Sequence, residues 1–256
     1  MAKIFCVANQ KGGVGKTTTT VNLSAGLAKL DQRVLLVDLD PQGNATMGAG
    51  INKAELAASI YQVLLGESDV ATARVRSEAG RFDVLPANRE LAGAEVEMVA
   101  LENRERRLKE ALAAVADDYD FILVDCPPAL SLLTLNGLCA ADGVIIPMQC
   151  EYYALEGLSD LVNTIKKVHA NLNTDLKIIG LLRVMFDPRM TLSQQVSNQL
   201  EQHFGDKVFK TIIPRNVRLA EAPSYGIPGV TFDPSSKGAQ AYIAFGAEMV
   251  QRIKTM

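Results

Sequence analysis

The chain has 256 residues, of which 48% are hydrophobic and 21% are charged, and its formal net charge is −3. This balance suits one folded domain with a sizeable core, and it excludes a largely disordered chain. Because the average charge is slightly negative, binding to DNA or to an anionic membrane would need a local basic patch.

Short β-rich segments alternate with longer helical patterns along the chain. The expected strands, several of them apolar throughout as in sheets covered on both faces, are Lys3–Asn9, Arg33–Asp38, Phe82–Pro86, Phe121–Asp125, Gly143–Met148, Lys177–Met185 and Lys207–Ile212. The expected helices are Lys16–Leu30, Ala54–Leu65, Leu91–Ala116, Leu155–His169, Leu192–Phe204 and Ala239–Lys254, with glycine- and proline-rich loops at 41–50, 126–128 and 214–238. The alternation predicts an α/β fold, a single domain over residues 1–256, with a mostly parallel sheet and helices on both faces.

A glycine-rich loop joins the first expected strand to the first expected helix. Its sequence is Lys11-Gly12-Gly13-Val14-Gly15-Lys16-Thr17, followed by Thr18. A strand, a glycine loop and Gly-Lys-Thr at the start of a helix are typical of the P-loop NTPase fold. Backbone N–H groups of this loop, including Thr18, would bind phosphate oxygens, and the helix N-terminus adds partial positive charge. We expect Lys16 to reach the β- and γ-phosphates and Thr17 to bind Mg²⁺, in an enzyme that hydrolyses ATP.

The loop departs from the common pattern at its entrance. Gln10 stands where the general motif has glycine, and a second lysine, Lys11, follows it. Since Lys16 already neutralises phosphates inside the loop, Lys11 could point across an interface toward a nucleotide held by a second copy. We therefore expect an ATP sandwich homodimer in which Lys11 acts in trans, as an arginine finger does. A solvated loop lysine is the alternative.

Carboxylates end two of the apolar strands. Asp125 ends one of them, at the sheet edge where ligands bind in this class of fold, and we expect it to reach Mg²⁺ through water. Asp38 ends another, and Asp40 lies just beyond it. We expect Asp40 to orient or deprotonate the attacking water. Asp38 would organise either the Mg²⁺ shell, through water, or the loop itself.

Four segments of the chain resemble motifs of a known family. The glycine-rich loop is similar to the deviant Walker A motif, which marks the SIMIBI class of P-loop proteins. Residues 38–44 (Asp-Leu-Asp-Pro-Gln-Gly-Asn) resemble a second acidic motif of that class, and residues 125–128 (Asp-Cys-Pro-Pro) resemble its Walker B motif. Residues 213–224 (Ile-Pro-Arg-Asn-Val-Arg-Leu-Ala-Glu-Ala-Pro-Ser) resemble a late loop typical of ParA/Soj chromosome-partitioning ATPases. The likeness spans roughly residues 1–250, without a long insertion.

The resemblance implies a molecular switch for chromosome or plasmid segregation. Members of this family bind Mg-ATP, dimerise around two nucleotides and then bind DNA without sequence preference, and a ParB/Spo0J partner stimulates hydrolysis. By position, Pro214 and Asn216 would contact adenine, Asp40 would serve hydrolysis and Thr17 would bind Mg²⁺. We expect a cytoplasmic, nucleoid-associated protein without stable membrane association.

Basic residues in and near the late loop are the candidates for contact with DNA. Arg189 follows an expected strand, Arg215 and Arg218 lie in the late loop, and Lys210 precedes it. Doubled in a dimer, they would form a patch suited to weak, salt-sensitive phosphate binding. The sequence has no helix-turn-helix or zinc pattern, so base reading is not expected. Ion pairs on a solvated surface are the alternative.

Two other functions share the same phosphate loop. A MinD-like membrane-associated ATPase would need a basic amphipathic C-terminal helix, whereas residues 238–254 carry few charges and are expected to complete the core. A metabolic ATP-dependent enzyme, either an amide ligase or a relative of the nitrogenase iron protein, is the second alternative. An iron–sulfur cluster would need cysteines at the dimer interface, for which Cys126 and Cys139 are candidates. We expect buried free thiols instead, because Cys6, Cys126 and Cys150 lie in or beside apolar runs.

Overall fold

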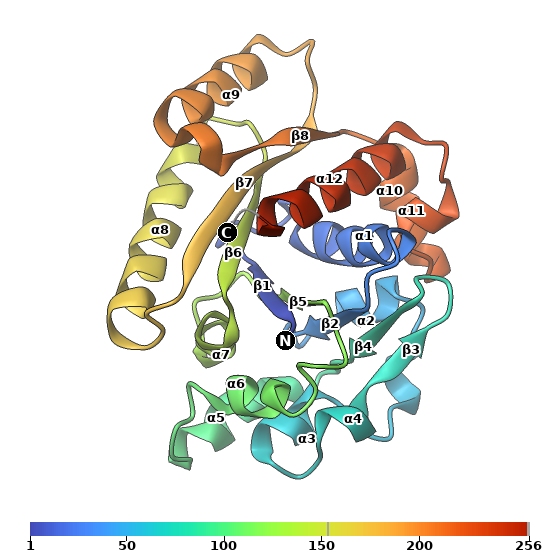
Figure 1. Ribbon diagram of the computed structural model, residues 1–256, viewed down its shortest axis with the longest axis vertical. Coiled ribbons are helices and arrows are strands. Elements are labelled where there is room, and N and C mark those ends of the chain that lie inside the picture. Colours follow the sequence, from blue (N-terminus) through green and yellow to red (C-terminus); the bar gives the residue numbers. More distant parts are fainter. Residues whose placement is uncertain (153, 255–256) are drawn as a thin grey trace.

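The computed structural model describes residues 1–152 and 154–254. Within these ranges one eight-stranded sheet has the order β3-β4-β2-β5-β1-β6-β7-β8 (Figure 1). The strands are β1 (Lys3–Val7), β2 (Val34–Asp38), β3 (Val75–Ser77), β4 (Phe82–Leu85), β5 (Phe121–Asp125), β6 (Gly143–Met148), β7 (Lys177–Phe186) and β8 (Val208–Pro214). The helices are α1 (Lys16–Lys29), α2 (Asn44–Gly48), α3 (Ile60–Leu65), α4 (Val70–Ala73), α5 (Leu91–Glu97), α6 (Arg107–Ala113), α7 (Leu132–Ala140), α8 (Ala154–Asn171), α9 (Thr191–Phe204), α10 (Val217–Glu221), α11 (Gly229–Phe232) and α12 (Lys237–Lys254). Single 3₁₀ turns are η1 (Lys53–Glu55), η2 (Met98–Ala100), η3 (Gly205–Lys207) and η4 (Ala222–Tyr225).

The first strand lies in the middle of the sheet. β1 runs parallel to β5 on one side and to β6 on the other, while the edge strand β3 pairs with β4 in antiparallel orientation. In the register of these strands, Val7 and Asp38 both lie opposite Asp125. The carboxyl ends of β1, β2 and β5 therefore meet at one edge of the sheet. The expected mostly parallel sheet is confirmed, and it brings the phosphate loop to the acidic strand ends.

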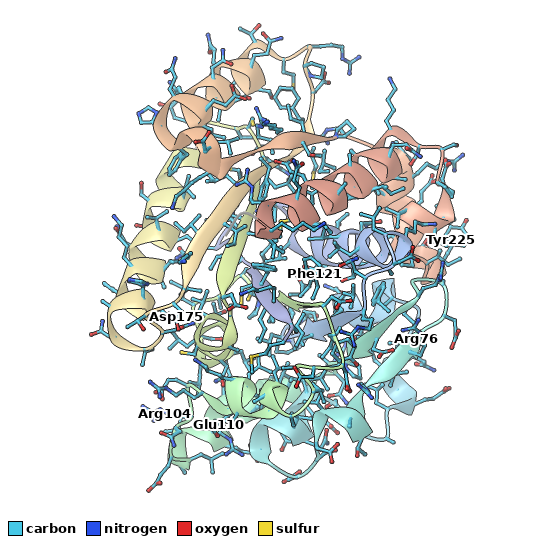
Figure 2. The ribbon with its side chains drawn as sticks, viewed as in Figure 1. Arg76, Arg104, Glu110, Phe121, Asp175 and Tyr225 are labelled. Carbon is cyan, nitrogen blue, oxygen red and sulfur yellow. The ribbon has the colours of Figure 1, made fainter. Side chains whose placement is uncertain are left out.

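Helices cover both faces of the sheet, as the sequence predicts. Side chains alternate between the faces: Phe5 belongs to the core beneath α1 and α12, whereas Cys6 and Val124 belong to the core beneath α3, α6, α7 and α8. Figure 1 shows α1, α10, α11 and α12 together on one side. In Figure 2, Phe121 lies inside the molecule and Arg104 lies at its periphery. Within the described ranges, none of the helices combines the length and apolar character needed to span a membrane.

Both edges of the sheet are short or covered. β3 has three residues, and its Arg76 pairs with Asp83 of β4 at 3.0 Å. At the other edge, the Glu248 carboxylate of α12 accepts hydrogen bonds from the backbone N–H groups of Lys210 and Thr211 in β8, at 2.8 and 2.9 Å. These bonds tie the last helix to the sheet, so the C-terminal segment completes the core as expected.

The expected helix at Leu91–Ala116 is wrong, because the chain forms α5, η2 and α6 there, with a break at 101–106. Asn103 in this break has a φ of 52°, in the left-handed region that asparagine tolerates better than most residues. Asn136 of α7 stabilises the new helix start, since its Oδ1 accepts a hydrogen bond from the Leu108 N–H at 3.1 Å. This contact is tertiary, so the local pattern of apolar residues could not locate the break.

The expected helix at Ala54–Leu65 is wrong in its first half, where η1 replaces it. The helix α3 begins after Ser59, whose side chain accepts a hydrogen bond from the Tyr61 N–H while its own N–H donates to Gln62. This capping box fixes the start of α3.

Several short elements fall outside the expected ones. The glycine- and proline-rich loops contain the short helices α2, α10 and α11, and the edge strand β3 and helices α4 and α7 also have no expected counterpart. Elements of three to five residues are too short to show a hydrophobic period, and α7 is apolar all round rather than amphipathic. The expected strands are all present, with ends that differ by at most two residues.

Candidate nucleotide site

The phosphate loop follows β1 and ends where α1 begins, in the context that its sequence predicts. Gly13 and Gly15 have φ angles of 73° and 77°, which glycine adopts without strain. Gly15 caps α1 without a side-chain hydrogen bond, so the first N–H groups of the helix remain available at the loop. These donors and the positive end of the helix form a site for phosphate oxygens.

Lys16 is the cation inside this loop. The residue is only 8% exposed, and its Nζ donates to the Lys11 carbonyl at 3.3 Å. Burial lowers the pKa of Lys16, and the carboxylates of Asp125 and Asp40 oppose that shift. Phosphate oxygens would be stronger, charge-assisted partners for the ammonium group than a backbone carbonyl is. The geometry therefore fits the expected phosphate-binding role of Lys16.

The candidate magnesium ligands lie beside the loop. The Thr17 hydroxyl donates to Oδ2 of Asp125 at 2.7 Å, and the Thr20 hydroxyl donates to Oδ1 at 3.0 Å. Asp125 is fully buried at the end of β5, and these two hydroxyls orient its carboxylate toward α1. Hydroxyl and carboxylate oxygens suit Mg²⁺, which prefers oxygen ligands. The structure thus brings together Thr17 and Asp125, the two residues that the sequence assigns to the metal.

Two buried carboxylates face each other next to this site. Asp125 and Asp38 lie opposite one another on β5 and β2, and both are fully buried. Burial raises the pKa of Asp125 and the charge of Asp38 adds to the shift, while hydrogen bonds from Thr17 and Thr20 and the charge of Lys16 oppose it. A divalent cation favours the ionised form of a nearby carboxylate. Metal binding at this position would therefore be linked to the release of a proton.

Replacing Asp125 with asparagine should change how the stability of the nucleotide-free protein depends on pH. Because the pKa of Asp125 is higher in the folded state, its contribution to stability is complete below the unfolded pKa of about 4 and is lost as the pH rises through the folded pKa. In EDTA, wild type should lose about 3–5 °C more melting temperature than Asp125→Asn between about pH 5 and pH 8. Asp206→Asn, at an exposed position, should follow wild type. A constant difference between wild type and Asp125→Asn across this range would contradict the raised pKa.

The loop after β2 is organised by Asp38 and carries Asp40. Oδ1 of Asp38 accepts from the Asp40 N–H at 3.1 Å, and Oδ2 accepts from the N–H and hydroxyl of Thr46 at 2.8 and 2.7 Å. Both oxygens of Asp38 are thus engaged inside the protein, which supports its role in organising the loop. Asp40 is half-buried, and its Oδ1 accepts from the Gln42 N–H at 2.9 Å.

A cavity of about 290 Å³ opens beside the phosphate loop. It lies between the start of α1, β7 and the segment after β8, and Pro214 and Asn216 both line its mainly apolar wall. Arg215, which the sequence assigns to DNA, lines this cavity as well. Asn216 also caps α10, since its Oδ1 accepts from the Leu219 N–H at 3.3 Å. An apolar cavity with a few polar groups, next to a phosphate site, suits the base and ribose of a nucleotide.

Lys11 lies at the exposed entrance of the loop. Its Nζ donates to Oε2 of Glu151 at 2.7 Å, and the two side chains are 44% and 50% exposed. Its N–H donates to Oδ1 of Asn9 at 3.0 Å, and the Asn9 amide donates to the Pro147 carbonyl at 2.8 Å. An exposed ion pair contributes only about 0–1 kcal/mol. Lys11 can therefore exchange Glu151 for a stronger anion with little loss of stability.

Two of the exposed basic residues that the sequence assigns to DNA, Arg189 and Arg218, are paired with carboxylates. Arg189 follows β7, and its guanidinium contacts Asp187 at 2.7 Å. Hydrogen bonds from Arg189 and the charge of Arg215 lower the pKa of Asp187 to about 2. Arg218 in α10 pairs with Glu221 at 2.9 Å. The structure thus brings Arg189 and Arg215 together near Asp187, while Arg218 pairs separately with Glu221 and with Asp233.

Two residues that contact the site are absent from the expected set. Thr20 bonds Asp125, and a sequence signal exists for it, because residues three apart on a helix share a face and Thr17 lies three positions earlier. Gln149 donates to the Gly13 carbonyl at 3.2 Å. No local motif marks Gln149, because only the pairing of β1 with β6 brings it to the loop.

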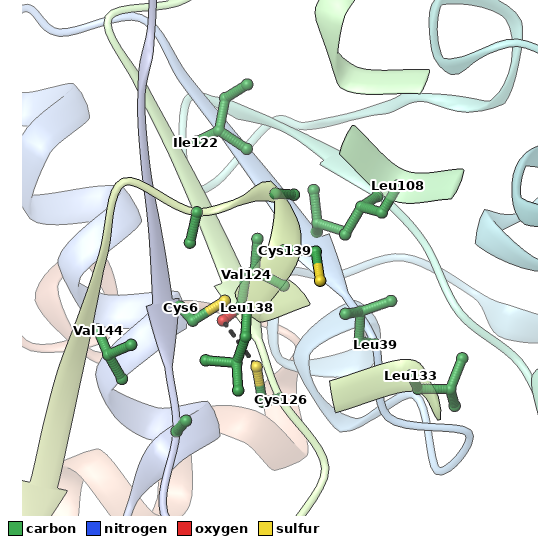
Figure 3. Close-up of a cluster of buried hydrophobic side chains, with 14 of the residues drawn as sticks. Cys6, Leu39, Leu108, Ile122, Val124, Cys126, Leu133, Leu138, Cys139 and Val144 are labelled. Atoms are coloured by element: carbon green, nitrogen blue, oxygen red, sulfur yellow. Dashed lines mark hydrogen bonds between the residues drawn. The ribbon is translucent and has the colours of Figure 1, made fainter. Parts of the chain in front are cut away.

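The four cysteines are free and buried, as expected. Figure 3 shows Cys6, Cys126 and Cys139 in one apolar cluster, where the Cys126 thiol donates to the Val124 carbonyl. Cys126 and Cys139 are each 1% exposed, so neither is presented to a second subunit. The geometry gives no support to the iron–sulfur alternative.

Comparison with known proteins identifies the family of this chain. A family model described as an AAA domain matches residues 2–178. The sporulation initiation inhibitor protein Soj of Bacillus subtilis is 54% identical over 249 residues, which cover 97% of this chain and 98% of Soj. The chain belongs to the ParA/Soj family of chromosome-partitioning ATPases. The chromosome partitioning protein ParA of Myxococcus xanthus is 50% identical to this ParA/Soj chain over 252 residues, which cover 98% of the chain and 89% of the relative.

A solved structure supports the fold of this ParA/Soj chain. It superposes with a TM-score of 0.87 at 40% identity and covers 99% of this chain and 96% of the other. That protein, from Mycobacterium smegmatis, is called cobyrinic acid a,c-diamide synthase and was crystallised with an ATP analogue and magnesium. The ParA/Soj chain is accordingly an ATPase with a P-loop NTPase fold, as its sequence predicts.

Proposed function

We propose that this ParA/Soj chain is an ATP-dependent switch that segregates a chromosome or a plasmid. With Mg-ATP bound, two copies form a sandwich dimer that binds DNA without sequence preference, in the cytoplasm and on the nucleoid. A ParB/Spo0J-type partner then resets the switch by stimulating hydrolysis. The names of the Soj and ParA relatives support a role in chromosome partitioning. The structural observation that carries the proposal is the place of Lys11 at the exposed entrance of the phosphate loop.

Different residues of the site would bind the phosphates, the metal and the adenine of Mg-ATP. Backbone N–H groups of the loop and Lys16 hold the phosphates, while Thr17 and Asp125, through water, hold Mg²⁺. The bound metal neutralises phosphate charge. Pro214 and Asn216 line the cavity for the adenine end of the nucleotide. These residues fit Mg²⁺ because the hydroxyl oxygens of Thr17 and Thr20 lie within hydrogen-bond distance of the Asp125 carboxylate.

The two lysines of the loop have different surroundings, which supports a role for Lys11 in trans. Lys16 is buried in the loop, whereas Lys11 points away to Glu151 at the surface. A triphosphate in the loop carries more negative charge than one glutamate, so the phosphates of a facing copy would compete well for Lys11. Each copy would then complete the other's site, and ATP would hold the dimer together.

The basic residues near the ends of β7 and β8 would become a shared DNA-binding face in this dimer. Arg189 and Arg215 flank Asp187, and Arg218 pairs with Glu221. Binding of a DNA phosphate therefore requires Arg189 and Arg218 to leave or share their carboxylates, which keeps the affinity low. Weak binding that is doubled by dimerisation suits a switch that must release DNA after hydrolysis.

Sequence-independent DNA binding that depends on ATP is the test of this function. Wild type with Mg-ATP should bind random duplexes, and with ADP or no nucleotide it should bind at least about tenfold more weakly. If the dimer contacts about four phosphates, affinity should fall about a hundredfold between about 50 and 200 mM salt. Lys11→Ala should keep Mg-ATP binding but remain monomeric on size-exclusion chromatography and lose the ATP dependence. An ATP-stable dimer of Lys11→Ala, or equal DNA binding in all nucleotide states, would refute the proposal.

A metabolic amide ligase is the second candidate, because the Mycobacterium smegmatis relative carries the name of such an enzyme. This function predicts that cobyrinic acid with an amide donor accelerates ATP hydrolysis. The partition function predicts instead that DNA and a ParB/Spo0J-type protein do so. Measuring phosphate release with each addition separates the two functions directly.

A further inference from the structure

The segment that follows β6 lies between two parts of the nucleotide site. β6 pairs with β1 on one side and with β7 on the other, so its carboxyl end lies between the phosphate loop and Met185 of β7. Gln149, the first residue after β6, is half-buried there. Its Nε2 donates to the Gly13 carbonyl at 3.2 Å and to the Met185 sulfur at 2.9 Å. One amide group therefore contacts both the phosphate loop and a wall residue of the nucleoside cavity.

The contact with Gly13 bears on the direction of one peptide group in the loop. Gly13 has a φ of 73°, and in a loop that binds phosphate the backbone N–H groups point inward. The hydrogen bond from Gln149 fixes the Gly13 carbonyl toward β6. A flip of this peptide would break the bond and turn a carbonyl oxygen toward the phosphates, which it would repel. Gln149 thus favours the loop conformation that binds an anion.

The contact with Met185 bears on the nucleoside cavity. Met185 has a φ of 50°, a conformation that a residue with a side chain keeps only when its surroundings hold it. Its side chain lines the cavity, and a Cβ added to Gly15 would lie 3.5 Å from its terminal methyl carbon. Met185 therefore lies against the phosphate loop as well as the cavity. The hydrogen bond from Gln149 helps to hold the side chain in this place.

We propose that Gln149 is a positioning residue that couples the nucleoside cavity to the phosphate loop. By holding the Gly13 carbonyl and the Met185 sulfur with the same amide group, it aligns the two subsites so that the base and the phosphates of one nucleotide bind together. Gln149 acts through Gly13 and Met185 rather than on the γ-phosphate. The inference rests on nucleotide binding alone, so it stands or falls independently of dimerisation and of DNA.

The substitution Gln149→Leu tests this coupling, because leucine has a similar size but no donor. The Kd for Mg-ADP and the KM for ATP should both rise about tenfold, as expected for the loss of one or two hydrogen bonds in a binding site. The kcat at saturating ATP should stay within about twofold, and the melting temperature without nucleotide should stay close to that of wild type. Gln240→Leu is the matched control, since Gln240 of α12 is exposed, donates to the Pro234 carbonyl and does not line the cavity.

A double-mutant cycle with Met185→Leu separates coupling from a merely structural role. Alone, Met185→Leu should raise the Kd for Mg-ADP about threefold, and added to Gln149→Leu it should have no further effect. Effects that multiply, or a Kd unchanged by Gln149→Leu, would overturn the proposal. If Gln149→Leu fails to fold, Gln149→Glu replaces it, because an ionised carboxylate has a similar size but cannot donate a hydrogen bond. Wild-type affinity of Gln149→Glu for Mg-ADP would also overturn the proposal.

Discussion

Replacing Lys16 with alanine should abolish detectable binding of Mg-ATP. Lys16 is the buried cation of the phosphate loop, and the partner that its Nζ has without nucleotide is a neutral carbonyl at 3.3 Å. The phosphates of the nucleotide would therefore be its first charge-assisted hydrogen-bond partners. Removing one member of a largely buried charge pair costs about 3–5 kcal/mol, so the Kd should rise by about 10²–10⁴-fold. Titration calorimetry or a fluorescent nucleotide should then give no saturable signal at concentrations that saturate wild type.

Folding should survive this substitution, which makes the result interpretable. Burial already lowers the pKa of Lys16, so the nucleotide-free protein gains little from the ammonium group, and Lys16→Ala should melt at or above the temperature of wild type. Lys29→Ala is the matched control, because Lys29 is an exposed lysine at the other end of α1. A Kd for Lys16→Ala within threefold of wild type would remove Lys16 from the phosphate site.

Replacing Asp40 with alanine should leave Mg-ATP bound and stop its hydrolysis. Asp40 is half-buried just beyond β2, and its charge acts on the Lys16 ammonium, so it lies close to the phosphates without belonging to the loop that holds them. A carboxylate in this position can orient or deprotonate the attacking water, a contribution of about 10²–10⁴-fold in rate. The kcat should fall by that factor while the Kd for Mg-ATP changes less than about fivefold. The protein should accumulate as a DNA-bound dimer.

A second variant distinguishes the chemical role of Asp40 from its role in the loop. Oδ1 of Asp40 accepts a hydrogen bond from the Gln42 N–H, and an asparagine side chain can keep that bond. Asp40→Asn should therefore be as slow as Asp40→Ala in phosphate release but should melt closer to wild type. Rapid turnover in both variants would show that another group activates the water.

The strands were open to prediction because they are buried on both faces. Phe121–Asp125 and Gly143–Met148 are continuous apolar runs with bounds that the structure reproduces. The long helix expected at Leu91–Ala116 fails because its break depends on Asn136, a side chain from another helix. A local pattern of apolar residues indicates which side chains are buried. It does not indicate where a side chain from another helix accepts a backbone hydrogen bond and so starts a new helix.

In the candidate site, too, local motifs could be predicted and contacts between distant segments could not. Residues in contiguous motifs, such as Lys16, Thr17 and Asp125, lie together as expected because one sheet edge collects the ends of their strands. Gln149 could not be found this way, since it has no motif and reaches Gly13 only through the pairing of β1 with β6. The pairing of Arg189 with Asp187 was equally hidden, because the sequence shows charges but not which of them are already neutralised.

The protected sheet edges limit how copies of this protein can associate. A free edge strand is a template for adding a strand from another molecule, and here β3 is three residues long while Glu248 occupies two backbone donors of β8. Growth of the sheet from molecule to molecule is therefore disfavoured at both ends. The proposed dimer would instead use the loops at the carboxyl ends of the strands, where a bound nucleotide would control association and pairing of sheet edges would not compete with it.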